Sequence, residues 1–241
     1  MDYEIDKLGQ RIGRKVADWR EPSRPVRPTL QGRTCRLEPL SVERHATALH
    51  AANSGDLDGR MWTYMPYGPF PDFADYRRWA DSAERSTDPV FLAIVDSTTG
   101  QAAGVASYLR IDPPNGSIEV GHIALSPRLQ RTPAATEAMY LMMSWAFSAG
   151  YRRYEWKCNA LNAASRRAAM RLGLSYEGVF RQAAVVKGRN RDTAWYAAVD
   201  SEWPALKRAF ERWLDPGNFD GAGQQRVSLS SLTDALLVSR G

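Results

Sequence analysis

The sequence is poor in the features that mark several classes of protein. Its 241 residues contain only two cysteines, Cys35 and Cys158, which lie far apart and outside any metal-ligand spacing. This argues against a disulfide-stapled secreted scaffold and against a zinc site, and it is typical of a protein in the reducing cytosol. We therefore expect neither a structural disulfide nor a bound metal.

Long apolar runs and runs of one charge sign are also scarce. The longest uncharged stretch near the middle, 138–151, is too short to cross a bilayer, and the start MDYEIDK lacks the basic-then-apolar order of a signal peptide. Lys and Arg exceed Asp and Glu by 32 to 27, but the densest basic stretch, 187–191, carries three cations and meets Asp192 at once. We expect a cytoplasmic protein without membrane contact, and nucleic acid as an unfavoured partner. The net charge of +5 suits a small polyanion, an acidic protein or nucleic acid about equally.

The composition present is that of a globular domain with two extensions. Hydrophobic residues make up 44%, charged residues 24% and aromatic residues 10% of the chain, which excludes disordered and fibrous classes. Residues 1–32 contain Pro22, Pro25 and Pro28 and form an N-terminal extension. Residues 33–214 form the domain. Residues 215–241 form a turn-rich tail with a short amphipathic helical stretch, 229–237, which we expect to pack on the body or on a partner.

Apolar runs and turn signals predict twelve elements between residues 34 and 214. Ser41 offers a helix cap, and Thr132 with Pro133 marks the start of the strongest helix. Three successive strands joined by tight turns form a meander. The predicted strands are 34–40, 90–95, 103–111, 117–125, 153–158, 175–180 and 193–199, and the helices are 41–52, 73–86, 133–149, 163–172 and 201–214.

One stretch carries a family resemblance. Residues 119–138, EVGHIALSPRLQRTPAATEA, run from an apolar strand through a Gln/Arg-bearing loop into the helix that begins at Pro133. This resembles the cofactor-binding core of the GNAT superfamily of N-acetyltransferases. Further matches at 162–165 (NAAS), 172–174 (LGL), 177–178 (EG) and 192–196 (DTAWY) look like the RimJ/RimL-type branch, which acetylates the N-termini of ribosomal proteins. The resemblance covers about 33–214. It implies an α+β fold in α/β/α layers, with a mostly antiparallel sheet that is splayed at the cofactor site and flanked by helices.

The resemblance also implies a binding site for acetyl-CoA. In the family the loop pattern Q/R-x-x-G-x-G/A cradles the pyrophosphate, and it falls here on 130–135, with Pro133 in place of the first glycine. A helix N-terminus binds phosphate well because its N–H groups are unpaired, but proline removes one of them. A proline that merely begins the helix well is the structural alternative. The predicted cofactor residues are Gln130, Arg131, Thr132, Ala134, Ala135 and Thr136 for phosphate, Ile123, Ala124 and Leu125 beside the thioester, and Asn162 and Ser165 along the pantetheine arm.

Acetyl transfer to an amine needs an unprotonated nitrogen, a polarised thioester carbonyl and an acid for the leaving thiolate. The resemblance implies a carboxylate base at Glu119, for which a structural ion pair is an equal alternative. Strand alternation would place Glu119 and Ile123 on one face and His122, the second candidate base, on the other. The resemblance implies that Ser165 protonates the thiolate or bonds the pantetheine arm, while Asn162 is equally well explained as a helix cap.

The acceptor side is predicted from aromatic residues and one carboxylate. Trp62, Tyr64 and Tyr67 match the family's aromatic acceptor loop in kind, although a protein interface would show the same residues. Asp192 matches a family position, where it faces the acceptor amine or pairs with Arg189 or Arg191. A second acidic residue that some members of the branch carry is absent, because Ala184 or Val185 stands there.

These observations predict an acetyl-CoA-dependent N-acetyltransferase. Its acceptor is a primary amine, either a protein or peptide N-terminal α-amine or a small-molecule amine, which attacks the thioester directly in a ternary complex. The alternative is a weakly active or inactive acyl-CoA-binding sensor or assembly module, with the two extensions supporting a homodimer. RNA association through the Arg/Lys clusters is the least favoured hypothesis.

Overall fold

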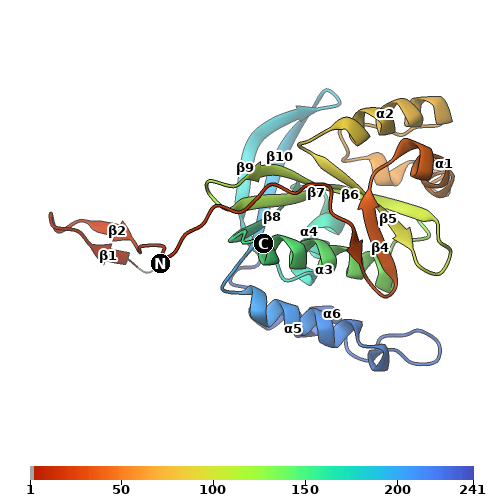
Figure 1. Cartoon of the computed structure of the whole chain (residues 1–241). Coiled ribbons are helices and arrows are strands. Elements are labelled where there is room, and N and C mark those ends of the chain that lie inside the picture. Colours follow the sequence, from red (N-terminus) through yellow and green to blue (C-terminus); the bar gives the residue numbers. More distant parts are fainter. Residues whose placement is uncertain (1–2) are drawn as a thin grey trace.

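Eight strands form one sheet in the order β3-β4-β5-β6-β7-β8-β10-β9 in the computed structural model, which describes residues 3–241 (Figure 1). All neighbours pair antiparallel except β7 and β8, which run parallel. The strands are β3 (Leu30–Gln31), β4 (Cys35–Pro39), β5 (Val90–Asp96), β6 (Ala102–Asp112), β7 (Ser117–Leu125), β8 (Arg153–Asn159), β9 (Ser175–Val186) and β10 (Arg189–Val199).

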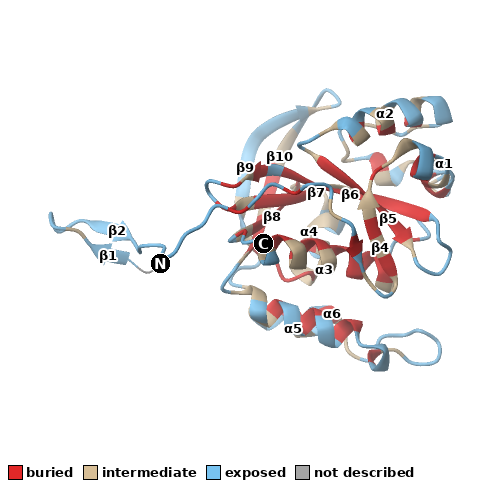
Figure 2. Cartoon of the chain, in the orientation of Figure 1, coloured by how far each residue is buried: buried red, intermediate tan, exposed pale blue. Residues whose placement is uncertain are grey.

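Helices cover both faces of this sheet. On one face α1 (Val42–Asn53) and α2 (Phe73–Arg85) enclose an apolar cluster with β5 and β6. On the other, α3 (Pro133–Ser148), α4 (Ala163–Arg171), α5 (Trp203–Leu214) and α6 (Leu229–Thr233) build the larger cluster (Figure 2). Three short 3-10 turns lie at Arg60–Trp62, Pro216–Asn218 and Asp234–Leu236. No helix among residues 3–241 combines the length and apolar character needed to span a membrane.

The order of elements from β4 to α5 is the one that the sequence predicts, and so is the layered α+β architecture. The predicted caps are present: Ser41 Oγ accepts from Arg44 N at 3.4 Å, and Thr132 Oγ1 accepts from Ala135 N at 3.2 Å. Pro133 is the first residue of α3, where a missing N–H breaks no helical bond.

The two extensions hold more structure than the sequence indicates. β1 (Tyr3–Ile5) and β2 (Arg11–Gly13) pair as a hairpin that projects from the body, and β3 joins the main sheet although it falls within the predicted extension (Figure 1). The segment between them lies on the body, where Tyr151 Oη donates to the Ser23 carbonyl at 3.1 Å. Prolines and alternating charges hide such short strands from a search for apolar periodicity.

β9 and β10 are longer than predicted and meet at a tight turn, Lys187–Gly188, where both residues have positive φ. The added residues are mostly exposed on both faces, so they carry no apolar alternation. They pair nonetheless, from Arg189 opposite Val186 down to Ala197 opposite Ser175. The hairpin therefore rises beyond the sheet toward the loop that follows α1 (Figure 1).

Candidate active site

The parallel strands β7 and β8 separate halfway along their length. Their pairing runs from Ser117 opposite Arg153 to Val120 opposite Trp156 and then stops. Beyond this point β7 stays bonded to β6, and β8 stays bonded to β10. The sheet therefore opens between the carboxyl ends of β7 and β8, which is where a ligand can reach backbone groups from both faces.

A β-bulge at His122 decides which side chains face each way. Val105 pairs with Ala124, but Ser107 pairs with Gly121, so His122 and Ile123 together oppose one residue of β6. His122 takes a left-handed φ of 50°. A bulge of this kind shifts the alternation of a strand by one residue.

The expectation that Glu119 and Ile123 share a face is therefore wrong. Val120 packs in the α3-side cluster before the bulge, which turns its neighbour Glu119 toward the α1–α2 side. Ile123 and Leu125 pack against the α3-side cluster after it. The His122 ring contacts Tyr67 and Phe91 and thus lies on the same side as Glu119, not opposite to it.

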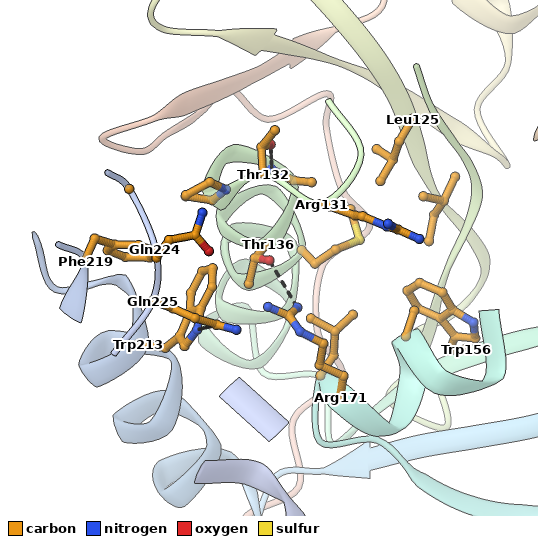
Figure 3. Close-up of a pocket in the computed structure, with 17 residues that line it drawn as sticks. Leu125, Arg131, Thr132, Thr136, Trp156, Arg171, Trp213, Phe219, Gln224 and Gln225 are labelled. Carbon is orange, nitrogen blue, oxygen red and sulfur yellow. Dashed lines mark hydrogen bonds between the residues drawn. The ribbon is translucent and has the colours of Figure 1, made fainter. Parts of the chain in front are cut away.

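A cavity of about 460 Å³ occupies the α3 side of the opening (Figure 3). This volume falls in the range of small-molecule sites. The cofactor residues predicted from the sequence that line it are Ile123, Leu125, Arg131, Thr132, Ala135 and Thr136. Ala124 does not, because its side chain packs on the opposite face of the sheet. Gln130 turns back to donate its side-chain amide to the Leu125 carbonyl at 2.8 Å.

The loop before α3 offers fewer free donors than predicted. Thr132 N–H bonds the Leu129 carbonyl at 3.4 Å, and Ala135 N–H is taken by the Thr132 hydroxyl. The N–H groups of Arg131 and Ala134 have no partner among the described residues. Arg131 has a φ of 61°, and its side chain lines the cavity. The N–H groups of Arg131 and Ala134 and the Arg131 guanidinium are thus open to an anion at the start of α3.

Ser165 lies just behind the cavity wall. Trp156, which lines the cavity, donates its indole N–H to Ser165 Oγ at 2.9 Å. Asn162 Oδ1 accepts from Ser165 N at 3.1 Å, so the helix-cap role of Asn162 is confirmed. Burial raises the pKa of the neighbouring Cys158, which bonds Ser165, and its thiol stays neutral. A buried thiol with a raised pKa is a poor nucleophile.

Aromatic residues cover the α1–α2 side of the opening. The Tyr67 ring stacks on His122 with 5.6 Å between centroids, and Tyr67 Oη lies 3.0 Å from His122 Nδ1. Trp62, Tyr64 and Tyr67 belong to the loop between α1 and α2, which we call the aromatic loop. In it, Trp62 is buried and packs against Tyr67. Tyr64 Oη donates to the Leu161 carbonyl at 3.2 Å, which ties the loop to the start of α4.

The turn of the β9–β10 hairpin is hydrogen-bonded to the same loop. Lys187 Nζ donates to the carbonyls of Trp62 at 2.9 Å and Gly68 at 2.8 Å. Lys187 lies in the exposed turn between β9 and β10, yet its ammonium group binds two carbonyls of this loop. A lysine in a polar turn gives no signal of such a distant partner, because the contact spans more than a hundred residues.

Asp192 takes neither of its predicted charged partners. Its carboxylate accepts from Gln182 N at 2.7 Å and from the Asn190 amide at 3.0 Å, and it forms no ion pair with Arg189 or Arg191 among the described residues. These two hydrogen bonds lower the pKa of Asp192. The residue therefore stabilises an irregular stretch of the hairpin, where the register shifts between Arg191 and Thr193.

The electrostatic environment keeps His122 neutral. Burial, then the charges of Arg110 and Arg191, lower the pKa of His122 to about 4. At pH 7 the imidazole is therefore uncharged. Its Nε2 has no hydrogen-bond partner among the described residues, whereas Nδ1 faces the Tyr67 hydroxyl.

Glu119 is held in a buried ion-pair network. Arg110 Nη1 lies 2.7 Å from each carboxylate oxygen, and Lys157 Nζ lies 3.0 Å from one of them. Lys157 also pairs with Glu155 at 2.7 Å and sits over the Trp195 ring. Burial raises the pKa of Glu119, and this outweighs the opposite effects of Lys157 and Arg110. The ion pair, one of the two roles considered from the sequence, is thus present.

Comparisons with known proteins agree with this geometry. A family model described as an acetyltransferase (GNAT) domain matches residues 35–175. The crystal structure of a GCN5-related N-acetyltransferase from Brucella melitensis is 47% identical, covers 91% of this chain and 100% of its own, and superposes with a TM-score of 0.89. A structure from Chromobacterium violaceum ATCC 12472, described as a probable acetyltransferase of the GNAT family, is 39% identical, covers 80% and 97%, and has a TM-score of 0.75.

More distant similarity shows the fold alone. An acetyltransferase from Salmonella typhimurium, described as modifying the N-terminal serine of ribosomal protein L7/L12, is 21% identical, covers 71% of this chain and 99% of its own, and has a TM-score of 0.61. No curated protein matches the chain. The family model and the close structures decide the matter: the chain belongs to the GNAT family of N-acetyltransferases, enzymes that use acetyl-CoA as acetyl donor.

Proposed function

We propose that the chain acetylates a terminal primary amine by direct attack on acetyl-CoA in a ternary complex. One observation carries this: the sheet opens between β7 and β8 with the cavity on one face and the Tyr67–His122 pair on the other. The donor would enter from the α3 side and the amine from the α1–α2 side. The two reactants then meet within the opening, and no covalent enzyme intermediate is needed.

The roles of the donor-side residues follow from their placement. Arg131 and the free N–H groups of Arg131 and Ala134 hold the pyrophosphate, and the backbone of β7 beyond the bulge, Ile123 to Leu125, supports the thioester carbonyl. When the amine nitrogen bonds the carbonyl carbon, the carbon–sulfur bond breaks and the thiolate needs a proton. Ser165 supplies it in this proposal and recovers one from solvent.

His122 is our choice for the group that receives the acceptor's proton. It is neutral, its Nε2 is unpartnered among the described residues, and it lies at the bulge itself. Arg110 and Arg191, which lower the pKa of His122, would lower the pKa of an acceptor ammonium at the same place. These charges favour the unprotonated amine, and His122 would orient it, take its proton as the carbon–nitrogen bond forms and release that proton to solvent. Glu119 positions Lys157 and Arg110.

The acceptor side favours a slim molecule that presents its amine at one end. Lys187 and Tyr64 tie the aromatic loop to the β9–β10 hairpin and to the start of α4, which narrows the approach from the side. A peptide N-terminus, the acceptor class of the RimJ/RimL-type branch, satisfies this, and so does a short small-molecule amine. Of the two we favour the peptide N-terminus because it offers further backbone groups to the hairpin edge.

The proposal is tested with a panel of peptides whose N-termini are free or blocked, together with small primary amines. Release of the CoA thiol and the mass of the product are followed at fixed acetyl-CoA. We expect acetylation of free N-termini and none of the blocked forms. His122→Asn, which tolerates the positive φ, should reduce kcat about 100-fold without changing acetyl-CoA affinity. Modification of blocked peptides at lysine, or full activity of His122→Asn, would overturn the proposal.

A further inference from the structure

The cavity extends well beyond the part of the chain that the family model matches. One end is formed by Leu125 and Trp156 at the opening of the sheet, and the other by Trp213, Phe219 and Gln224 from α5 and the C-terminal tail (Figure 3). The start of α3 lies between these two ends. A donor whose acetyl end reaches the opening and whose pyrophosphate meets α3 must place its remaining portion toward the tail.

Arg171, the last residue of α4, lies at the tail end with unused donors. Its Nη1 donates to Thr136 Oγ1 at 3.1 Å, and its guanidinium lies 5.1 Å from the Trp213 ring centroid. No carboxylate of the described residues forms an ion pair with it, and its other N–H donors have no acceptor there. A guanidinium held in place by a ring and a hydroxyl, but lacking a counter-ion, is suited to bind phosphate.

The tail loop brings an aromatic ring and an amide to the same place. Phe219 packs edge-on against Trp213 at 5.3 Å, and Trp213 donates its indole N–H to Gln225 Oε1 at 2.7 Å. Phe219 and Gln225 form a β-bridge that shapes the loop between them. The side-chain amide of Gln224 has no hydrogen-bond partner among the described residues and lines the cavity. A ring with a free amide beside it is the chemistry that recognises a nucleobase.

We propose that the C-terminal tail completes the donor site by binding the adenosine half of acetyl-CoA, with Arg171 bound to one of its phosphates and Phe219 and Gln224 covering the base. From the sequence, the tail is expected only to pack on the body or on a partner. The Gly/Pro-rich composition of the tail contains no ligand-binding motif. This proposal concerns the donor, which the family fixes, and it holds whichever amine is the acceptor.

The test is calorimetric titration of the full chain with CoA and with 4′-phosphopantetheine, which lacks the adenosine. The variants are Arg171→Gln, Phe219→Ala and Gln224→Ala, and the control is Val238→Ala, an exposed residue of the same tail. We expect the Kd for CoA to rise at least tenfold in Arg171→Gln and threefold to tenfold in the other two. The Kd for 4′-phosphopantetheine should stay within twofold of the wild-type value in Phe219→Ala and Gln224→Ala.

Two results would overturn the proposal. One is a CoA affinity within twofold of wild type in all three variants. The other is an equal loss for both ligands in Phe219→Ala and Gln224→Ala, which would indicate a general disturbance of the cavity. Gln224→Ala keeps the test decisive if Phe219→Ala unfolds the tail, because the Gln224 side chain makes no hydrogen bond that the fold needs. Neither result depends on acetyl transfer, so failure here is separate from failure of the proposed acceptor.

Discussion

Replacing Glu119 by Gln separates its role as an ion-pair anchor from a role as general base. The carboxylate is 3% exposed and contacts both Arg110 and Lys157. Removing one partner of a buried pair typically costs about 3–5 kcal/mol of stability. Two features reduce that figure here: Lys157 keeps Glu155 at 2.7 Å, and the side chain of Arg110 is 59% exposed and can turn to solvent. Burial also raises the pKa of Glu119, so folding disfavours its ionised form relative to the neutral form.

We therefore expect Glu119→Gln to lower the free energy of unfolding by about 2 kcal/mol at pH 7, with kcat reduced less than about tenfold. Urea denaturation followed by tryptophan fluorescence measures the first quantity, and initial rates at saturating acetyl-CoA measure the second. Glu155→Gln is the matched control, because it removes the other carboxylate bound to Lys157. An unchanged unfolding free energy with a kcat loss above about 100-fold would refute the anchor role and make Glu119 the base.

Four further outcomes follow from the structure. Pro133→Gly adds an N–H at the start of α3 and should tighten acetyl-CoA binding about threefold to tenfold by calorimetry, with a lower Tm; equal affinity would show that the existing donors suffice. Lys187→Ala should raise the acceptor KM severalfold while the Kd for CoA stays constant, and a change in Kd alone would contradict this. Burial alone would raise the pKa of Glu137, but the hydrogen bonds donated by 33–35 outweigh this effect and lower the pKa. The ionised carboxylate therefore stabilises the fold above its unfolded-state pKa, and this contribution is lost as the pH falls. Glu137→Gln should thus cost about 2 kcal/mol at pH 7 and less at pH 3.5 in urea titrations, and equal losses would disprove the reasoning. The pKa of His122 is about 4, so the charge of this imidazole should not change between pH 5 and 8. Any change of kcat/KM with pH in that range should therefore be the same in the wild type and in His122→Asn.

The sequence predicts the fold well because local signals agree with one another. Apolar runs, the caps at Ser41 and Thr132, and the proline at the start of α3 each mark an element that the structure contains. The loop-to-helix junction also predicts most of the cavity residues at the β7 and α3 side. These are signals within a few residues of each other, and the backbone hydrogen bonds that they report are local.

The rest of the site depends on contacts that no local pattern reports. The bulge at His122 reverses the expected faces of β7, and an alternation of apolar and polar residues does not show where an extra residue is inserted. Lys187 and Arg171 reach the site from a polar hairpin and a helix end, where cations usually face solvent. Glu137 carries no local signal that separates it from other helix residues, yet its carboxylate accepts hydrogen bonds from three backbone N–H groups at 33–35, about a hundred residues away.

The bulge lets one strand present neighbouring side chains to opposite faces of the opened sheet. Without the bulge, Ile123 would lie on the same face of β7 as Glu119. The apolar side chains of β7 that line the cavity would then point toward the aromatic loop. The extra residue turns Ile123 and Leu125 toward the cavity, while His122, in the left-handed conformation, remains on the α1–α2 side with Tyr67. Close packing restricts the residue before it: a Cβ at Gly121 would lie 2.9 Å from Leu109 Cδ2 and 3.4 Å from Glu119 Oε1. The position of the imidazole, the ion pairs of Glu119 and the lining of the cavity therefore all depend on the backbone of 119–123.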